Sequence, residues 1–139
     1  MDWNRIDYFD CYEFDDPNYP GSGDCIDKSL LLNLVALRRV TGWKVLTHYS
    51  VGGAVDIDGS WGHSGNSLHL SNSGCKAVDF HFETNTPINI QLYYVMITGF
   101  AGIGVCPYWN NPGFHVDTRL IRRTSLWSSP AKRVYKYLL

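Results

Sequence analysis

The sequence has no run of eighteen apolar residues, so it predicts no segment that crosses a membrane. It also lacks the basic and then apolar opening of a secretory signal, since it begins Met1-Asp2-Trp3-Asn4. A formal net charge of -1 gives no sign of a nucleic-acid partner. We therefore expect a protein made in the cytoplasm, with no membrane insertion and no nucleic-acid binding.

Closely paired cysteines are missing as well. The four cysteines are widely spaced and form no C-x-x-C motif, which argues against a thiolate zinc knuckle or a dithiol redox site: Cys11, Cys25, Cys75 and Cys106. We expect buried free thiols, with a Cys11–Cys25 disulfide as the alternative. A thiol hydrolase that uses Cys75 beside His69 or His81 is a further alternative.

Acidic residues are absent after Asp117, although the two charge signs nearly balance over the whole chain. Eight of the thirteen acidic residues lie between Asp2 and Asp27. Half of the twelve basic residues form a C-terminal tail: Arg119, Arg122, Arg123, Lys132, Arg133 and Lys136. Such ends are commonly solvated surfaces that attract each other, and the alternative is that the tail contacts an anionic polymer or a partner.

The length and the apolar content predict a single compact domain. The chain has 139 residues, of which 45% are hydrophobic, enough for one core of ordinary size. Residues 1–26 are rich in turn formers and predict an irregular arm that packs on the domain. Residues 27–139 form the domain itself, with the basic tail at its end.

The hydrophobic pattern predicts two helices and four strands. Leucines recur at helical spacing between Asp27, a typical N-cap, and Gly42, while a second helix is expected over 87–98. A glycine-rich loop is expected over 50–66. The expected strands are 43–48, 78–83, 102–106 and 113–118. This order indicates the α+β class, with a small, largely antiparallel sheet flanked by helices.

Polar residues alternate with apolar ones on two of the expected strands. Asp79 and His81 share one strand face, and His115 and Asp117 share another. If the strands are neighbours and His69 reaches them from its loop, two nitrogens and one oxygen can bind zinc and leave a fourth position open. The alternative is that these are ordinary strand residues with satisfied hydrogen bonds.

Two motifs make the chain recognisable. Ser67-Leu68-His69 followed by Lys76-Ala77-Val78-Asp79 resembles the S-x-H-x-x-G-x-A-x-D signature of the zinc D-Ala-D-Ala carboxypeptidase family, which shares its fold with the Hedgehog signalling domain. The segments 102–108 and 113–119 resemble the second signature of its peptidoglycan peptidase branch. The resemblance implies a zinc peptidase of this fold that cleaves stem peptides or cross-links in bacterial peptidoglycan. By position it implies that His69, Asp79 and His115 bind one Zn²⁺ ion.

The chain departs from that family in three places. His69 and Asp79 are ten positions apart, three more than in the family, with Ser71-Asn72-Ser73-Gly74 as a turn that can bulge outward. Pro112 and Gly113 stand where many relatives carry the general base. Residues 47–50 replace the segment with the arginine that holds the substrate carboxylate, which favours cleavage within a peptide over carboxypeptidase action.

These departures leave the catalytic base open. Asp117 is the first candidate, and it is equally a group that orients His115; the reserves are His81, Asp58 and His63. Tyr108, Trp109, Trp61 and His63 are candidates for the walls of a substrate groove, or for ordinary packing. We expect either an endolysin of bacteriophage type or a virion component, so that virion proteins are candidate partners and the enzyme meets the wall after release. The alternative is a non-catalytic zinc-binding module that serves structure or assembly.

Overall fold

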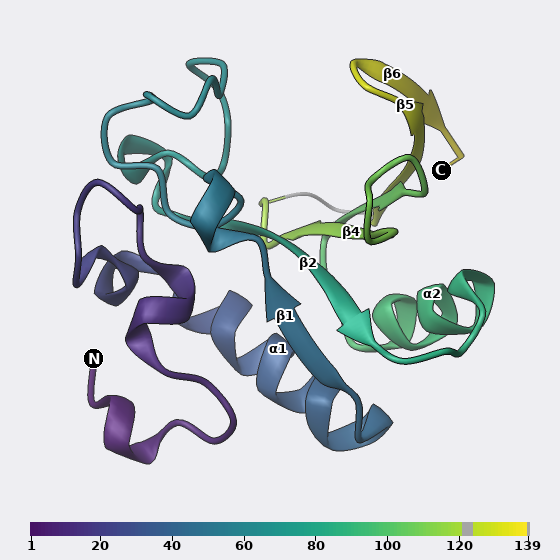
Figure 1. Ribbon diagram of the computed structural model, residues 1–139, viewed down its shortest axis with the longest axis horizontal. Coiled ribbons are helices and arrows are strands. Elements are labelled where there is room, and N and C mark those ends of the chain that lie inside the picture. Colours follow the sequence, from purple (N-terminus) through teal and green to yellow (C-terminus); the bar gives the residue numbers. More distant parts are fainter. Residues whose placement is uncertain (121–123, 139) are drawn as a thin grey trace.

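The computed structural model describes residues 1–120 and 124–138 and has two helices against a six-stranded sheet (Figure 1). The helices are α1 (Lys28–Thr41) and α2 (Ile88–Ile97). The strands are β1 (Lys44–Thr47), β2 (Ala77–Glu83), β3 (Gly102–Cys106), β4 (Gly113–Asp117), β5 (Ser125–Ala131) and β6 (Val134–Tyr137). In the order β1-β2-β4-β3-β5-β6, only β3 and β5 pair in parallel. The predicted α+β class with a largely antiparallel sheet is confirmed.

Local sequence signals set the ends of α1. The carboxylate of Asp27 accepts a hydrogen bond from the Leu30 amide at 2.9 Å, which caps the helix start. Gly42 ends the helix in the left-handed conformation, with φ of 70°, where glycine has no steric penalty. Among the described residues, no helix has the length and apolar content needed to cross a membrane.

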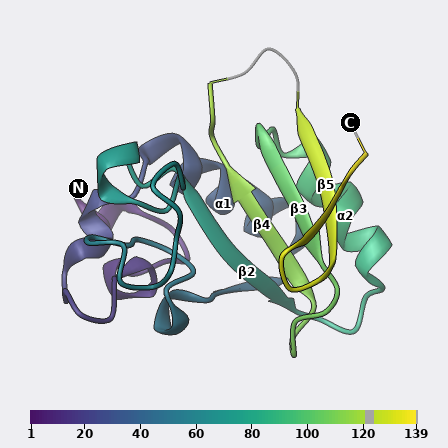
Figure 2. The same ribbon diagram turned by 90° about the horizontal axis from the view of Figure 1, so that it is seen from above.

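The sheet has one apolar face and one polar face. Val78, Phe80 and Phe82 on β2 are buried in the core, and α1 and α2 lie on that side of the sheet (Figure 2). Asp79 and His81 alternate with them and therefore lie on the opposite face. The polar face of the sheet is where the candidate site is found.

The first 26 residues supply part of the same core. They contain three short 3-10 helices, Trp3–Arg5, Cys11–Phe14 and Ser22–Cys25. Phe9, Phe14 and Ile26 are buried together with the leucines of α1. The arm is therefore packed into the domain core through its own apolar side chains.

β5 and β6 are the elements that the sequence pattern does not predict. β5 reads Ser-Leu-Trp-Ser-Ser-Pro-Ala, without the apolar alternation of a half-buried strand. The basic tail thus contains two strands: β5 extends the sheet by pairing with β3, and β6 pairs with β5. Of the basic residues in that tail, Arg122 and Arg123 lie outside the described residues.

Replacing Gly104 by alanine is expected to lower the free energy of unfolding by about 1–3 kcal/mol, the usual cost of overpacking. A Cβ atom at this position of β3 would lie 2.6 Å from Nε1 of Trp127, which packs over the strand. Denaturant unfolding measures the change. Gly65→Ala is the matched control because a Cβ atom at that position would meet no other atom within 4 Å; equal losses for the two variants would contradict the packing argument.

Candidate metal centre

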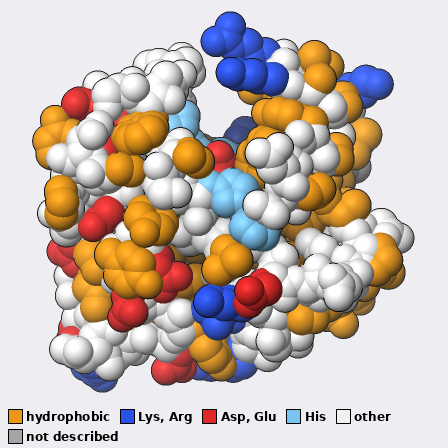
Figure 3. All heavy atoms as spheres, viewed as in Figure 1, with side chains coloured by type: hydrophobic (Ala, Val, Ile, Leu, Met, Phe, Trp, Pro, Cys, Tyr) orange, Lys and Arg blue, Asp and Glu red, His pale blue; other side chains and the backbone are white. Residues whose placement is uncertain are grey.

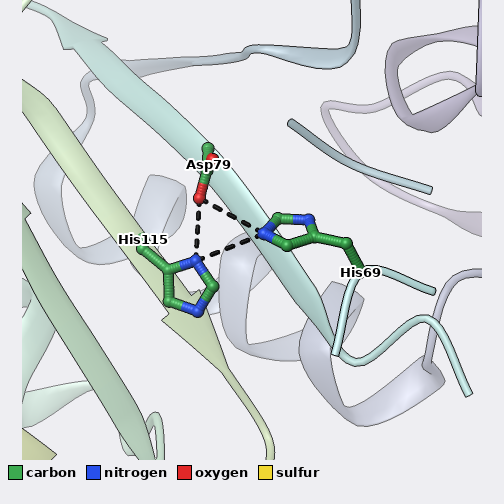
Figure 4. A group of neighbouring side chains, drawn as sticks. All are labelled: His69, Asp79 and His115. Atoms are coloured by element: carbon green, nitrogen blue, oxygen red, sulfur yellow. Dashed lines mark hydrogen bonds and ion pairs between the residues drawn. The ribbon is translucent and has the colours of Figure 1, made fainter. Parts of the chain in front are cut away.

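Three side chains from separate segments converge on the polar face of the sheet (Figure 4). Asp79 on β2 lies directly opposite His115 on β4 in the strand register, and His69 reaches them from the preceding loop. Asp79 Oδ1 is 2.8 Å from Nδ1 of His115 and 3.5 Å from Nε2 of His69, and the two nitrogens are 3.3 Å apart. The structure thus brings together the three residues that the sequence predicts as metal ligands.

The outer nitrogen of each histidine is held by an acceptor. Nδ1 of His69 lies 2.9 Å from the carbonyl oxygen of Ala54, which can only accept, so this nitrogen carries the proton. Nε2 of His115 likewise lies 3.2 Å from Oδ2 of Asp117. Outer hydrogen bonds of this kind orient metal-binding imidazoles. They direct Nε2 of His69 and Nδ1 of His115 toward Asp79.

The donor set fits zinc. Tetrahedral zinc with ligand bonds of about 2.0–2.2 Å needs ligand atoms roughly 3.3 Å from one another. The separations of 3.3 and 3.5 Å that involve His69 meet this requirement. Nδ1 of His115 and Oδ1 of Asp79 are 2.8 Å apart, joined by a direct hydrogen bond. These two atoms would have to move slightly apart for both to bind the ion. Three protein ligands leave a fourth position for water or substrate.

Neighbouring groups raise the pKa of His115 and lower that of Asp79. Burial by itself would lower the pKa of His115, but hydrogen bonds to Asp117 and Asp79 outweigh burial and raise that pKa to about 9. Burial would raise the pKa of Asp79, but the charge of His69 and the hydrogen bond from His115 bring it well below its ordinary range. The cluster is therefore built around an anionic carboxylate that attracts positive charge.

A backbone hydrogen bond joins the two ends of the inserted turn before β2. The turn forms a short 3-10 helix, Ser71–Ser73, in which Ser71 and Asn72 are exposed and Ser73 is half-buried. Gly74 follows in the left-handed conformation. The Lys76 amide donates to the carbonyl of Leu68 at 2.7 Å and closes the turn at its base. The predicted outward bulge is confirmed, and it leaves His69 free to reach Asp79.

Asp117 is buried behind His115 and is held by Arg119. Its side chain has no solvent exposure, and Nε of Arg119 donates to its Oδ1 at 2.7 Å. Burial would raise the pKa of Asp117, yet the hydrogen bonds from Arg119 and His115 lower it well below its usual range. Asp117 also contacts the nitrogen of His115 that faces away from Asp79. This position suits a group that orients His115 and does not suit a general base beside Asp79.

His63 lies against the cluster. Its ring stacks on that of His69 with centroids 4.4 Å apart and an interplanar angle of 8°. Its Nδ1 is 2.7 Å from Oδ2 of Asp56, a carboxylate with no solvent exposure. Burial first, and then the charge of His69, lower the pKa of His63. Asp56 is a member of the site that sequence reasoning misses, because only the loop fold pairs it with His63.

His81 lies outside the ligand cluster, two residues further along β2. Its Nδ1 is 2.9 Å from Nε2 of His48, and the His48 ring packs on Trp109 with centroids 4.9 Å apart. His48 is the second residue missed from the sequence. It follows β1, where its amide donates to the carbonyl of Asp79 at 2.8 Å and fixes it beside the site.

The remaining predicted residues lie away from the cluster or have structural partners. Asp58 is exposed and accepts from Tyr19 and Ser60. Trp61 donates from Nε1 to Asp16, and Tyr108 is an exposed neighbour of Trp109. The three carboxylates Asp16, Asp56 and Asp58 form a second acidic group, but their oxygens accept hydrogen bonds from protein donors.

The four cysteines are free thiols in the structure, so the alternative disulfide between Cys11 and Cys25 is not formed. The expected burial holds for Cys75 and Cys106 but is wrong for Cys11, which is half-buried, and for Cys25, which is exposed. Cys75 is buried, and burial raises the pKa of its thiol to about 11. A protonated buried thiol is a poor nucleophile. These features disfavour the thiol hydrolase alternative.

The polar face of the sheet is hollowed (Figure 3). Histidine side chains gather in the hollow, between the part that carries the N-terminal residues and the part that carries β5 and β6. On the β5 side, Trp127 packs on His115 with ring centroids 5.4 Å apart, and the guanidinium of Arg119 lies over Trp127. The ligand cluster is therefore partly shielded, while Asp79 and His115 each keep a fifth of their side-chain surface exposed.

Comparisons of this chain with protein-family models, with curated proteins and with solved structures find no match. The relation to zinc D-Ala-D-Ala carboxypeptidases therefore stays a prediction that rests on the motif residues.

Proposed function

We propose that this protein is a zinc-dependent peptidase that hydrolyses peptide bonds in bacterial peptidoglycan, as an endolysin or virion component that meets the wall from outside the cytoplasm. One observation carries the proposal: ligand atoms of His69, Asp79 and His115 converge, while the outer nitrogens of the two histidines are held by hydrogen bonds. The wall substrate is supported by the motif resemblance alone. The binding of a metal ion is supported by the short distances between the ligand atoms of His69, Asp79 and His115.

A bound zinc ion supplies Lewis-acid activation of the scissile carbonyl and of the attacking water. His63 is our candidate for the proton carrier, because its Nδ1 donates to Asp56 and its other nitrogen is then left as a base. Burial lowers the pKa of His63, so the ring is neutral at pH 7 and ready to accept a proton. Asp56 stabilises the imidazolium that forms until the proton passes to the leaving amine.

Arg119 and Asp117 have a positioning role. Arg119 neutralises the buried Asp117, and Asp117 fixes the ring orientation and protonation of His115. Trp127 covers this chain of contacts on the β5 side. Asp117 is thus assigned to orienting His115, and the proton transfer is assigned to His63.

Zinc-loaded protein incubated with peptidoglycan is expected to release new amino groups, and a chelator is expected to stop the release. Adding zinc back should restore the release of amino groups. The second candidate function is a zinc-binding module without catalysis, favoured by Pro112 and Gly113 where relatives carry a base. Stoichiometric zinc without any release of amino groups would support the module and contradict the peptidase.

Zinc affinity is expected to rise about tenfold per pH unit from neutral pH up to pH 9, since zinc has to displace one proton from His115. The pKa of His115 is raised from 6.5 to about 9, so the metal-free ring is charged at pH 7. The same proton stabilises the metal-free fold below pH 6.5, and that stabilisation is lost as the pH rises through 9. Calorimetry in buffers of different ionisation enthalpy counts the released protons; no release at pH 7 would contradict this assignment.

A further inference from the structure

A cavity lies beside the ligand cluster at the far end of β2. It has a volume of about 360 Å³, and its walls come from β2, from the start of α2 and from the turn between β3 and β4. Its lining includes His81, Thr86, Gln91, Pro107, Asn111 and Pro112. The cavity is a half-open groove and not an enclosed space.

The strand geometry connects this cavity to the cluster. His81 lies on the same face of β2 as Asp79, and residues two apart on a strand are separated by about 7 Å. On β4, position 113 shares the face of His115, and Gly113 places no side chain there. An extended peptide has the same residue spacing as β2. If one residue of the peptide lies at Asp79, the residue two positions further along the peptide therefore lies at the cavity.

The lining of the cavity has no aspartate, glutamate, lysine or arginine. Its polar groups are hydroxyls and carboxamides, together with the His81 imidazole. A charged substrate side chain that entered would lose water without gaining an opposite charge, which is costly. The uncharged lining therefore favours an uncharged substrate side chain.

Gln91 forms part of the cavity wall. Its Nε2 donates to the carbonyl of Thr86 at 2.6 Å, which fixes the orientation of the amide. Its side chain is buried, with 7% of the residue exposed, and its Oε1 has no hydrogen-bond partner among the described residues. This oxygen has almost no accessible surface, so Gln91 contributes a fixed, uncharged part of the wall.

We propose that the cavity is a substrate subsite for an uncharged residue two positions from the bond held at the metal centre. The inference rests on the proposed peptidase function and specifies its substrate class. The substrates are extended peptides with a neutral side chain at this position. The protein should discriminate against acidic and basic residues there.

The test uses short alanine-based peptides that differ at this one position, which carries glutamine, glutamate or lysine. The zinc-loaded protein should cleave the glutamine peptide with a kcat/KM at least about tenfold higher than either charged peptide. Asn111→Asp, a change on the exposed rim, should raise the relative rate for the lysine peptide. Asn72→Asp makes the same change on the remote exposed turn and should leave the preference unaltered. Equal rates for the three peptides would overturn the subsite.

A binding measurement separates this inference from the peptidase proposal. The same peptides are titrated into the protein while the side-chain amide signals of Gln91, which lines the cavity, are followed by NMR. Selective binding of the glutamine peptide that shifts these signals, with no hydrolysis, would keep the subsite and reject the peptidase. Hydrolysis with no shift would reject the subsite alone, and absence of peptide binding would also reject it.

Discussion

Replacing His69 by alanine is expected to abolish stoichiometric zinc binding and, with it, the release of amino groups from peptidoglycan. The variant loses the nitrogen that faces both Asp79 and His115 and keeps only two of the three ligands. Loss of groups that merely orient ligands already costs about 10–100-fold in metal affinity, so loss of a ligand should exceed 100-fold. Metal analysis after dialysis, together with competition against a chelator, measures the change.

The matched control for this change is His81→Ala. His81 is a half-buried histidine on the same face of β2, and its partner is His48 instead of the ligand cluster. This variant should keep one zinc per chain. If His69→Ala binds zinc as the unmodified protein does, the ligand assignment is wrong, whatever the activity of either variant.

Replacing His63 by alanine is expected to lower kcat by about 10²–10⁴ while zinc stays bound, the range for loss of a general acid–base group. His63 stacks on His69 but is not one of the three converging ligands. Its pKa is lowered from 6.5, so the active neutral form should persist to pH values below 6.5. Steady-state rates between pH 5 and 8, with zinc content measured in parallel, test both statements.

Two further variants identify the proton carrier. Asn66 is exposed and lies in the same loop as His63, so Asn66→Ala should leave kcat unchanged. Asp117→Asn removes the charge behind His115 and should weaken zinc binding about 10–100-fold while kcat at saturating zinc is largely kept. The reverse pattern, with kcat lost in Asp117→Asn and retained in His63→Ala, would assign the base to Asp117.

The strongest local patterns predicted their elements correctly. The capping carboxylate of Asp27 and the left-handed Gly42 define α1, and the alternation over 78–83 defines β2 with Asp79 and His81 on one face. These features depend on neighbours in sequence, so they can be read without the fold. The expected helix over 87–98 also agrees with α2 to within a residue at each end.

Other elements depend on contacts that the sequence does not display. β5 forms because it pairs with β3, where Gly102 and Gly104 leave room for Asp117 and Trp127. The pairing of Asp56 with His63, and of His48 with His81, joins positions on irregular loops or at strand ends, where periodicity carries no information. The roles of His63 and Asp117 were open in the sequence for the same reason.

The sequence by itself determined the class of the fold, the main helices and inner strands, and the identity of the three candidate ligands. It did so because side-chain alternation and capping are local, and because two motifs in the right order select His69, Asp79 and His115. Only the tertiary structure decided how these ligands are supported. The backbone path brings Ala54, Asp117 and His63 within reach of the imidazoles, and such long-range proximity is a property of packing.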